Sequence, residues 1–372
     1  MNQEWLTDRF WLAGENLVLL PERSADLVRE IGQTLQALQI ARAVIFQSSG
    51  TTGAARFVVH SREALLASAR AVNAHLEARY SDVWLCALPV FHVGGFAVYA
   101  RAYCSKSRVY EFHGKWDADR FVEQCIHHCA TLSSLVPTQV HDLVKAGIAS
   151  PPTLRAILVG GGQLDQALEL EARHLGWPIL RTYGLSEAAS QVATQRGDAL
   201  ILLPHLEAAL GENGRLRLRG ASLLNGYLSA REDGGWSYED PKDERTWFLT
   251  DDVVELDGDE LRFIARRSSQ VKILGELVDV ESIERAFLQA LPRGLEVALI
   301  DVPDIRSQNA LVAAFTDRLQ GEWLEAQIHS FNATLAGFER IARATHLARL
   351  PRGPLGKLRR GELRRLLLEA EK

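Results

Sequence analysis

Two loops rich in glycine and hydroxyl side chains follow predicted strands, and their composition suits the binding of a phosphorylated ligand. The first, Gln47 to Arg56, reads QSSGTTGAAR and holds two serines, two threonines and two glycines within six residues. Backbone N–H groups and hydroxyls in such a loop can cradle an anion, although the Gly-Lys-Ser/Thr ending of the Walker loop is absent. An ordinary turn between a strand and a helix is the alternative, and composition alone does not separate the two.

The second loop, RTYGLSEAASQ, runs from Arg181 to Gln191 and places Ser186 and Glu187 where a strand gives way to a predicted helix start. Mg²⁺ takes oxygen ligands and usually bridges to substrate phosphates, so Glu187 is a candidate metal ligand. The alternative is a first-turn carboxylate that is stabilised by the helix dipole. The loop taken alone favours that alternative slightly.

Four further positions carry chemistry less specifically. Gly160 to Gly162 follow LRAILV, where the absence of side chains lets a planar group approach the backbone, or where the chain simply turns tightly. His92 follows ALPV at the end of a strand, and a lone histidine is more often structural than catalytic. The pairs Gly275-Glu276 and Gly356-Lys357 set a charged residue beside a flexible one, which unaided describes ordinary solvated surface.

The segment CIHHC, Cys125 to Cys129, resembles metal-ligand spacing. It lies within a predicted amphipathic helix in which Cys125 and Cys129 share a face with Phe121, and a zinc site needs further ligands. Packing in the core is therefore the favoured interpretation.

The elements that must position these residues alternate between strand and helix from about residue 41. Such alternation predicts an α/β fold with βαβ units and a mostly parallel sheet covered on both faces, so that ligands bind at the carboxyl ends of the strands. The predicted buried strands are 41–47, 82–88, 107–112, 130–136, 154–160 and 177–183.

The pattern changes after about residue 200. Short alternating strands at 214–220, 246–256 and 259–265 predict a small β subdomain, and the polar stretch 265–270 is a candidate hinge. We therefore expect a large N-terminal domain over 1–264 and a small α+β domain over 265–372.

Composition excludes several classes of protein. The 372 residues carry a net charge of −5, and 47% are hydrophobic, which argues against disorder and against binding of nucleic acid through bulk charge. No apolar run reaches the roughly 18 residues of a membrane span, and the N-terminus does not read as a secretory signal. Four irregularly spaced cysteines do not predict a disulfide framework. We expect a cytoplasmic enzyme.

Taken together and in order, these segments resemble the adenylate-forming (AMP-binding) superfamily of acyl- and aryl-CoA synthetases, luciferases and adenylation domains. The resemblance covers nearly the whole chain from residue 41. The matching motifs are SSGTTGAAR, TYGLSE, LTDD, ARRSSQVKILGELVDVESIE and PRGPLGKLRR. Three stretches, WLCALPVFHVGG, SLVPTQV and TYGLSEAASQVAT, are similar to the o-succinylbenzoate–CoA ligases of menaquinone biosynthesis.

The resemblance implies an ATP-dependent acid–CoA ligase that forms an acyl-adenylate and then a thioester, with ATP, Mg²⁺ and CoA as cofactor and co-substrates. Another aryl or acyl acid, transfer to a carrier protein, or a non-catalytic nucleotide-binding member are the alternatives. The implied partners are small molecules, without nucleic acid or membrane span, and a homodimer is left open.

The resemblance also implies roles for individual residues. Lys357 would bridge the α-phosphate and the substrate carboxylate, Glu187 and Thr51 would lie near Mg²⁺, and His92 would gate the acid pocket. The residues implied to bind the phosphates are Ser48, Ser49, Gly50, Thr51, Thr52, Gly53 and Ser186. Those implied at adenine and ribose are Gly161, Gly162, Tyr183, Gly184, Asp252 and Arg266. Those implied for the CoA-forming conformation are Lys272, Gly275 and Glu276, and the polar pocket lining is Thr138, Ser190 and Gln191.

Three features depart from the family pattern. Ala55-Arg56 stands where the phosphate loop usually ends in Pro-Lys, which keeps a cation but changes its geometry. Ser268 stands at the hinge position that usually holds Asp or Lys. The phosphate loop also begins near residue 48, whereas family members usually carry a hundred or more residues before it. Because Lys357, Glu187, Asp252 and Glu276 are all present, an active enzyme is still expected.

Overall fold

A computed structural model gives the fold of the chain. It describes residues 3–21, 24–47, 56–231, 234–267, 270–274, 276–292, 295–304, 307–316, 321–353 and 356–370. No helix in these ranges is both long enough and apolar enough to cross a membrane.

The largest sheet has eleven strands, and one half of it is parallel. The parallel strands lie in the order β8, β7, β6, β4, β5. Their bounds are β4 Val83–Cys86, β5 Arg108–Glu111, β6 Leu132–Leu135, β7 Ala156–Val159 and β8 Ile179–Leu185. Each of these strands coincides with a predicted one, and the predicted α/β class with a parallel-rich sheet is confirmed.

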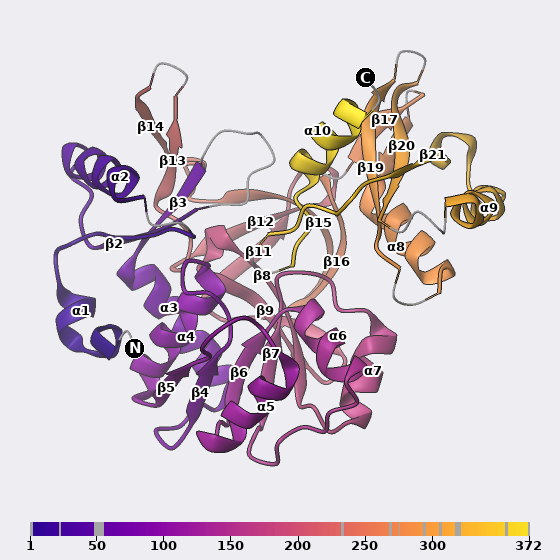
Figure 1. Cartoon of the computed structure of the whole chain (residues 1–372). Helices are drawn as coiled ribbons and strands as arrows, with labels where there is room; N and C mark the ends of the chain where they lie inside the picture. The colour runs from indigo at the N-terminus through magenta and orange to yellow at the C-terminus, as the bar shows by residue number, and fades with distance from the viewer. Residues whose placement is uncertain are drawn as a thin grey trace.

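Helices cover both faces of this parallel half, as the sequence predicted (Figure 1). Side chains alternate between the faces along a strand. In β4, Trp84 and Cys86 therefore join the core under one layer of helices, while Leu85 joins the core under the other. The first layer is α3 (Arg62–Leu76) and α4 (Val93–Ser105), and the second is α5 (Ala118–His127), α6 (Pro137–Lys145) and α7 (Gln166–His174).

The predicted small β subdomain is the antiparallel half of the same sheet. Strand β9 (Ser190–Arg196) pairs antiparallel with β8, and the order continues through β10, β16, β15, β12 and β11. Their bounds are β10 Ala199–Leu202, β11 Leu206–Leu210, β12 Arg215–Gly220, β15 Phe248–Asp257 and β16 Glu260–Arg266. A short turn η3 (Glu212–Gly214) precedes β12.

The strand that precedes the candidate phosphate loop lies outside this sheet. Strand β2 (Ala43–Gln47) belongs to a second sheet of five strands, in which it pairs parallel with β1 and antiparallel with β3. The expectation of one parallel sheet containing 41–47 is therefore wrong. The other strands are β1 Leu17–Leu19, β3 Arg56–Ser61, β13 Gly226–Ala230 and β14 Trp236–Glu239. Helix α2 (Ala25–Ala37) packs Ile31 and Leu35 against them.

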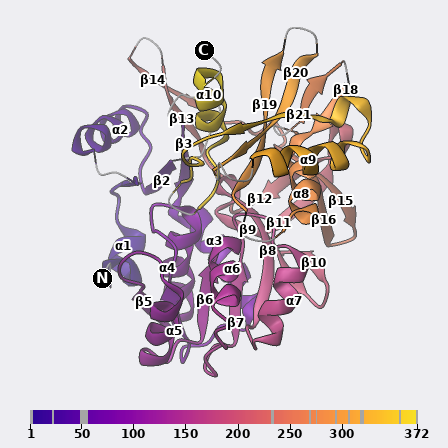
Figure 2. The ribbon, with the colours of Figure 1, turned by 45° about the vertical axis from the view of Figure 1, so that its right-hand side comes forward.

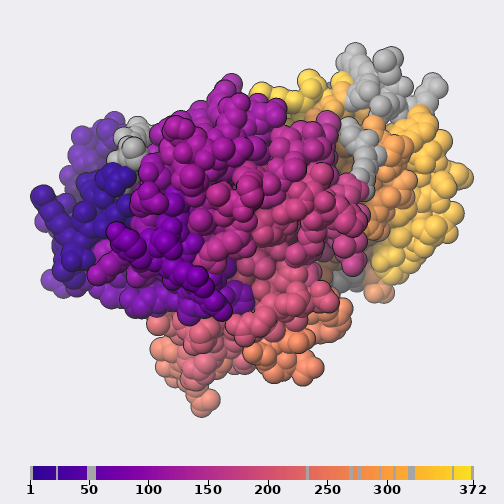
Figure 3. Space-filling model, turned by 90° about the horizontal axis from the view of Figure 1, so that it is seen from below, coloured from indigo at the N-terminus to yellow at the C-terminus, as the bar shows by residue number. Residues whose placement is uncertain are grey.

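The N-terminal residues form η1 (Gln3–Leu6) and α1 (Asp8–Leu12), which set Trp5 and Trp11 against α4. Trp5 contacts Phe96 and Tyr99 edge-on, each with ring centroids 5.0 Å apart. Figure 3 shows this indigo segment at one side of the large domain and the C-terminal residues at the other.

From residue 270 the chain forms separate small sheets (Figure 2). Strand β16 ends at Arg266, two residues beyond the expected boundary at 264. The hairpin β17 (Gln270–Ile273) and β18 (Glu276–Asp279) precedes a sheet of β19 (Val297–Asp304), β20 (Gln308–Phe315) and β21 (Ile341–His346). Helices α8 (Val280–Ala290) and α9 (Gly321–Asn332) pack on one face, α10 (Arg360–Ala370) on the other, and η6 (Gly337–Glu339) precedes β21. Ser268, the candidate hinge residue, lies outside the described residues.

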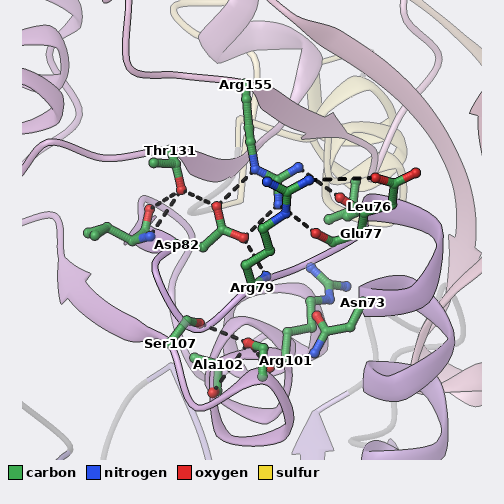
Figure 4. A network of polar contacts seen from close by, with 12 residues as sticks. Asn73, Leu76, Glu77, Arg79, Asp82, Arg101, Ala102, Ser107, Thr131 and Arg155 are labelled. Atoms are coloured by element: carbon green, nitrogen blue, oxygen red, sulfur yellow. Dashed lines mark hydrogen bonds and ion pairs between the residues drawn. The ribbon is translucent and has the colours of Figure 1, made fainter.

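An ion pair with a buried carboxylate ties the central strands to the end of α3 (Figure 4). Arg155 donates to both oxygens of Asp82, at 2.8 and 2.6 Å, and to the carbonyl oxygen of Leu76 at 2.7 Å. Thr131 and the backbone N–H of Arg79 also donate to Asp82. Burial alone would raise the pKa of the Asp82 carboxyl, but these hydrogen bonds together lower it.

We predict that Arg155→Met lowers the free energy of unfolding at pH 7 by about 2–3 kcal/mol, because it leaves the buried Asp82 carboxylate with fewer donors. The partial exposure of Arg155 keeps the loss below that of a fully buried pair. A carboxyl whose folded pKa is lowered contributes stability above its unfolded pKa and loses it as the pH falls through the folded value. The difference from wild type should therefore shrink in acid. Urea unfolding at pH 7 and pH 3 measures it, with Arg29→Met in an exposed pair as the control. An equal loss at both pH values would contradict this assignment.

Candidate functional site

The predicted site residues of the large domain lie where the parallel strands end. Gly161 and Gly162 follow β7, and Thr138 follows β6. Gly161 has φ +78°, and a Cβ at Gly161 would lie 3.4 Å from Val136. The two glycines therefore lie against the turn that starts α6. Because they have no side chains, their exposed backbone is accessible at the sheet edge.

The end of β8 forms a bulge followed by the turn η2 (Ser186–Ala188). The predicted helix start is wrong, because one 3₁₀ turn leads directly into β9. Gly184 is required here, since a Cβ would lie 1.8 Å from the carbonyl oxygen of Ser190. Ala189 and Ser190 have φ of 54° and 98°, so the chain reverses sharply and presents Ser186 and Glu187 at the sheet edge.

Asp252 on β15, Arg266 on β16 and Tyr183 on β8 come together at one end of the sheet. Arg266 donates from Nε to Oδ1 of Asp252 at 2.6 Å and from Nη2 to Oδ2 at 3.2 Å. The Tyr183 hydroxyl donates to Oδ2 at 2.6 Å. Burial and the charge of Asp252 raise the pKa of Tyr183, so this hydroxyl remains a donor. We refer to these three residues as the Asp252 group.

Lys357 of the C-terminal domain lies close to the Asp252 group. A Cβ on the preceding Gly356 would lie 3.2 Å from Oγ1 of Thr138, so this loop reaches the large domain. Desolvation by the surrounding protein lowers the pKa of the Lys357 amine, and the charge of Arg266 lowers it further. Part of the side chain is nevertheless exposed to solvent. Glu281 and Asp252 oppose these effects. The loop therefore brings a cation to the large domain near the Asp252 group.

His92 caps the start of α4 on the same side of the sheet. Burial lowers its pKa, and the positive charge of Lys357 lowers it further, so its imidazole is neutral at pH 7. Its Nε2 is buried without a hydrogen-bond partner among the described residues. The structure therefore brings His92 and Lys357 within electrostatic reach of each other.

Sequence reasoning missed one residue of the site, Arg101, which lies in α4. Arg101 is 2% exposed, and its guanidinium donates to Ser134 at 3.4 Å and to the predicted pocket residue Ser190 at 3.3 Å. Burial lowers its pKa to about 10, and it forms no ion pair with a carboxylate in the part of the chain that the structure describes. A buried cation of this kind needs an anionic partner, and a ligand can supply one.

A second polar side chain near Arg101 also lacks a protein partner in the described ranges. Gln191, also predicted for this pocket, is 4% exposed, and neither amide atom has a partner among the described residues. The ring of Trp84 lies 5.7 Å from the guanidinium. The signal that could have revealed Arg101 is a lone cation within the apolar helix VGGFAVYARAYCS.

The remaining predicted residues are distributed as follows. Ser48 to Gly53, Thr51 among them, and Gly275 lie outside the described residues. Lys272 and Glu276 lie on the β17–β18 hairpin, and both are exposed.

The expectation for Cys129 is wrong. Cys125 is buried beside Phe121, but Cys129 lies beyond the end of α5 with φ 51° and is exposed. Within the described ranges no cluster of three His, Cys, Asp or Glu side chains could hold a metal ion.

Comparison with known proteins agrees with this geometry. The model of the AMP-binding enzyme family matches residues 40–228, just over half of the chain. The chain belongs to the AMP-binding enzyme family. The matched residues 40–228 include the glycine-rich loop, the ends of the parallel strands and the turn that carries Glu187.

Among individual members of the AMP-binding family, the 2-succinylbenzoate–CoA ligase of Listeria monocytogenes is 29% identical over 345 residues, covering 89% of this chain and 71% of that enzyme. The Bacillus pumilus enzyme of the same name is 28% identical over 273 residues, covering 69% of this chain and 54% of that enzyme. A variant of E. coli MenE with bound OSB-AMS has a TM-score of 0.69 and 25% identity, covering 87% of this chain and 68% of that one. The chain is therefore shorter than each of these relatives.

Proposed function

We propose that this protein is an ATP-dependent acid–CoA ligase that forms an acyl-adenylate and then a CoA thioester, with o-succinylbenzoate as its acid. The position of Lys357 near the Asp252 group and His92 carries the proposal, because it sets a cation of the C-terminal domain between the proposed nucleotide edge and the proposed acid pocket. The named relatives support the same chemistry.

In the first step a substrate carboxylate oxygen attacks the α-phosphorus of ATP and pyrophosphate leaves. Asp252 and Arg266 hold the ribose, and Gly161, Gly162 and Tyr183 flank the adenine. Lys357 offsets the negative charge that collects where the carboxylate meets the α-phosphate, while Ser186 contacts that phosphate. The protein acts mainly by positioning and by preorganised charge.

Glu187 fits a role in holding Mg²⁺. Its Oε1 accepts a hydrogen bond from Tyr227 at 2.9 Å, and the carboxylate forms no ion pair with any described residue. Carboxylate oxygen is a ligand that Mg²⁺ prefers, and Thr51 is the second candidate ligand. When bound, the ion neutralises phosphate charge and orients the leaving pyrophosphate.

In the second step the CoA thiolate attacks the acyl carbon and AMP leaves. We propose that the C-terminal domain rotates between the steps, withdrawing Lys357 and bringing the hairpin of Lys272, Gly275 and Glu276 to the site. His92 closes the acid pocket. Lys272 and Glu276 are exposed on this hairpin, so both side chains are available to a site that the rotation brings near them.

The substrate assignment rests on Arg101. A diacid such as o-succinylbenzoate presents one carboxylate for adenylation and a second for recognition. The buried guanidinium, flanked by Ser134 and Ser190 and without a protein carboxylate in the described ranges, matches the second carboxylate.

A panel of acids tests the assignment. We expect pyrophosphate release with ATP and Mg²⁺ to be selective for o-succinylbenzoate over benzoate and fatty acids, by about 10²-fold or more in kcat/KM, because a buried cation rejects acids that leave it unpaired. Thioester formation should require added CoA. Turnover of another acid would keep the mechanism and discard the substrate, and nucleotide binding without turnover on any acid would favour a non-catalytic member.

A further inference from the structure

Three hydrogen bonds converge on the turn that carries Glu187. The imidazole Nε2 of His60 lies 2.6 Å from the carbonyl oxygen of Ser186. The backbone N–H of Leu224 donates to the carbonyl oxygen of Glu187 at 2.8 Å. The Tyr227 hydroxyl donates to Oε1 of Glu187 at 2.9 Å, so this last bond holds the carboxylate itself rather than the backbone.

The contacting side chains project from one face of the five-stranded sheet. In the antiparallel pair β3–β13, Tyr227 lies opposite Val58, so His60 and Arg56, each two residues from Val58, share that face with Tyr227. The core behind the turn includes Val58, Tyr227 and Ala188. The sheet that bears the glycine-rich loop therefore also supports the Glu187 turn of the larger sheet.

The Tyr227 ring is fixed on its other side. Tyr227 is 6% exposed, and the guanidinium carbon of Arg56 lies 3.3 Å from the centroid of its ring. A planar guanidinium stacks on an aromatic face in a way that a lysine ammonium cannot, which gives Arg56 a role at the position where the family pattern has lysine.

We propose that Tyr227 is a positioning residue that holds the Glu187 carboxylate in its metal-binding orientation, with the ring fixed by Arg56. This inference rests on the proposed function, which places Mg²⁺ at Glu187. The bond engages Oε1 and leaves Oε2 available to a cation, and it restricts the freedom of the carboxylate side chain to turn away. Partners of this kind commonly change metal affinity 10- to 100-fold.

Metal binding without turnover tests the proposal. The probe is Mn²⁺ titrated into the full chain with saturating α,β-methylene-ATP, and free Mn²⁺ is counted by electron paramagnetic resonance. We expect Tyr227→Phe to weaken Mn²⁺ binding about 10-fold, because the ring and its stacking remain while one charge-assisted hydrogen bond is lost. Tyr238→Phe, a half-buried tyrosine on the neighbouring strand β14, is the matched control and should bind Mn²⁺ as the wild type does.

Two further variants separate the possible failures. Glu187→Gln should weaken Mn²⁺ binding more than Tyr227→Phe does, and adding Tyr227→Phe to Glu187→Gln should change nothing further, because the two residues act as one unit. Normal Mn²⁺ binding by Tyr227→Phe alongside weak binding by Glu187→Gln would overturn the positioning role alone. Normal binding by Glu187→Gln would instead overturn the metal site of the proposed function. Equal thermal unfolding midpoints establish that the variants fold alike.

Discussion

Replacing Lys357 with alanine is expected to slow adenylation by about 10²- to 10³-fold, because it removes a preorganised cation from the place where phosphate and carboxylate charges meet. Thioester formation from supplied acyl-adenylate should remain within about two- to three-fold of wild type, because the α-phosphate transfer is then already complete and Lys357 contributes no interaction specific to that step. The proposed rotation of the C-terminal domain predicts this separation of the two half-reactions.

Pyrophosphate release and thioester formation, each followed in single turnover, measure the two steps. Lys145→Ala, on the exposed end of α6, is the control and should leave both rates unchanged. Since the protonated amine is the active form and its pKa is lowered, adenylation should fall as the pH rises through a value below that of an ordinary lysine. Lys357→Arg should lose this alkaline fall. An equal loss in both half-reactions would exclude the proposed division of roles.

The fold of the parallel half could be predicted because its signals are local. Strands β4 and β7 are buried at every position, so each appears in the sequence as a short continuous apolar run. The sheet to which a strand belongs depends instead on distant partners. Strand β2 carries the same kind of run, but its neighbours are β1 and β3.

The family motifs predicted most of the candidate site, and physical contacts explain the remainder. Asp252, Arg266 and Tyr183 were each expected at the nucleotide, and the structure joins them by hydrogen bonds. Arg101 was not expected, because its partners Ser134 and Ser190 lie 33 and 89 residues away along the chain. A helix pattern reports which face is buried and gives no indication of what a buried cation meets there.

The buried cation itself supplies the second large expected effect. Replacing Arg101 with methionine should lower kcat/KM for o-succinylbenzoate by about 10²-fold or more, since a charge-assisted bond to the recognised carboxylate is lost. The reference substrates are 3-benzoylpropionate and 2-butyrylbenzoate, each of which lacks one of the two carboxylates of the diacid. The one that retains the reacting carboxylate should be turned over by the variant about as well as by the wild type.

Stability distinguishes this role from a structural one. Arg101 is buried with two serine contacts and no protein carboxylate in the described ranges, so the free protein bears its desolvation cost. Methionine fills much of the same volume without a charge, and Arg101→Met should therefore keep or raise the free energy of unfolding, by up to about 2 kcal/mol. Arg101→Lys should recover part of the selectivity. A loss of stability together with an equal loss on diacid and monoacid would mean that Arg101 holds the helix in place, and the assignment of a diacid substrate would lose its physical basis.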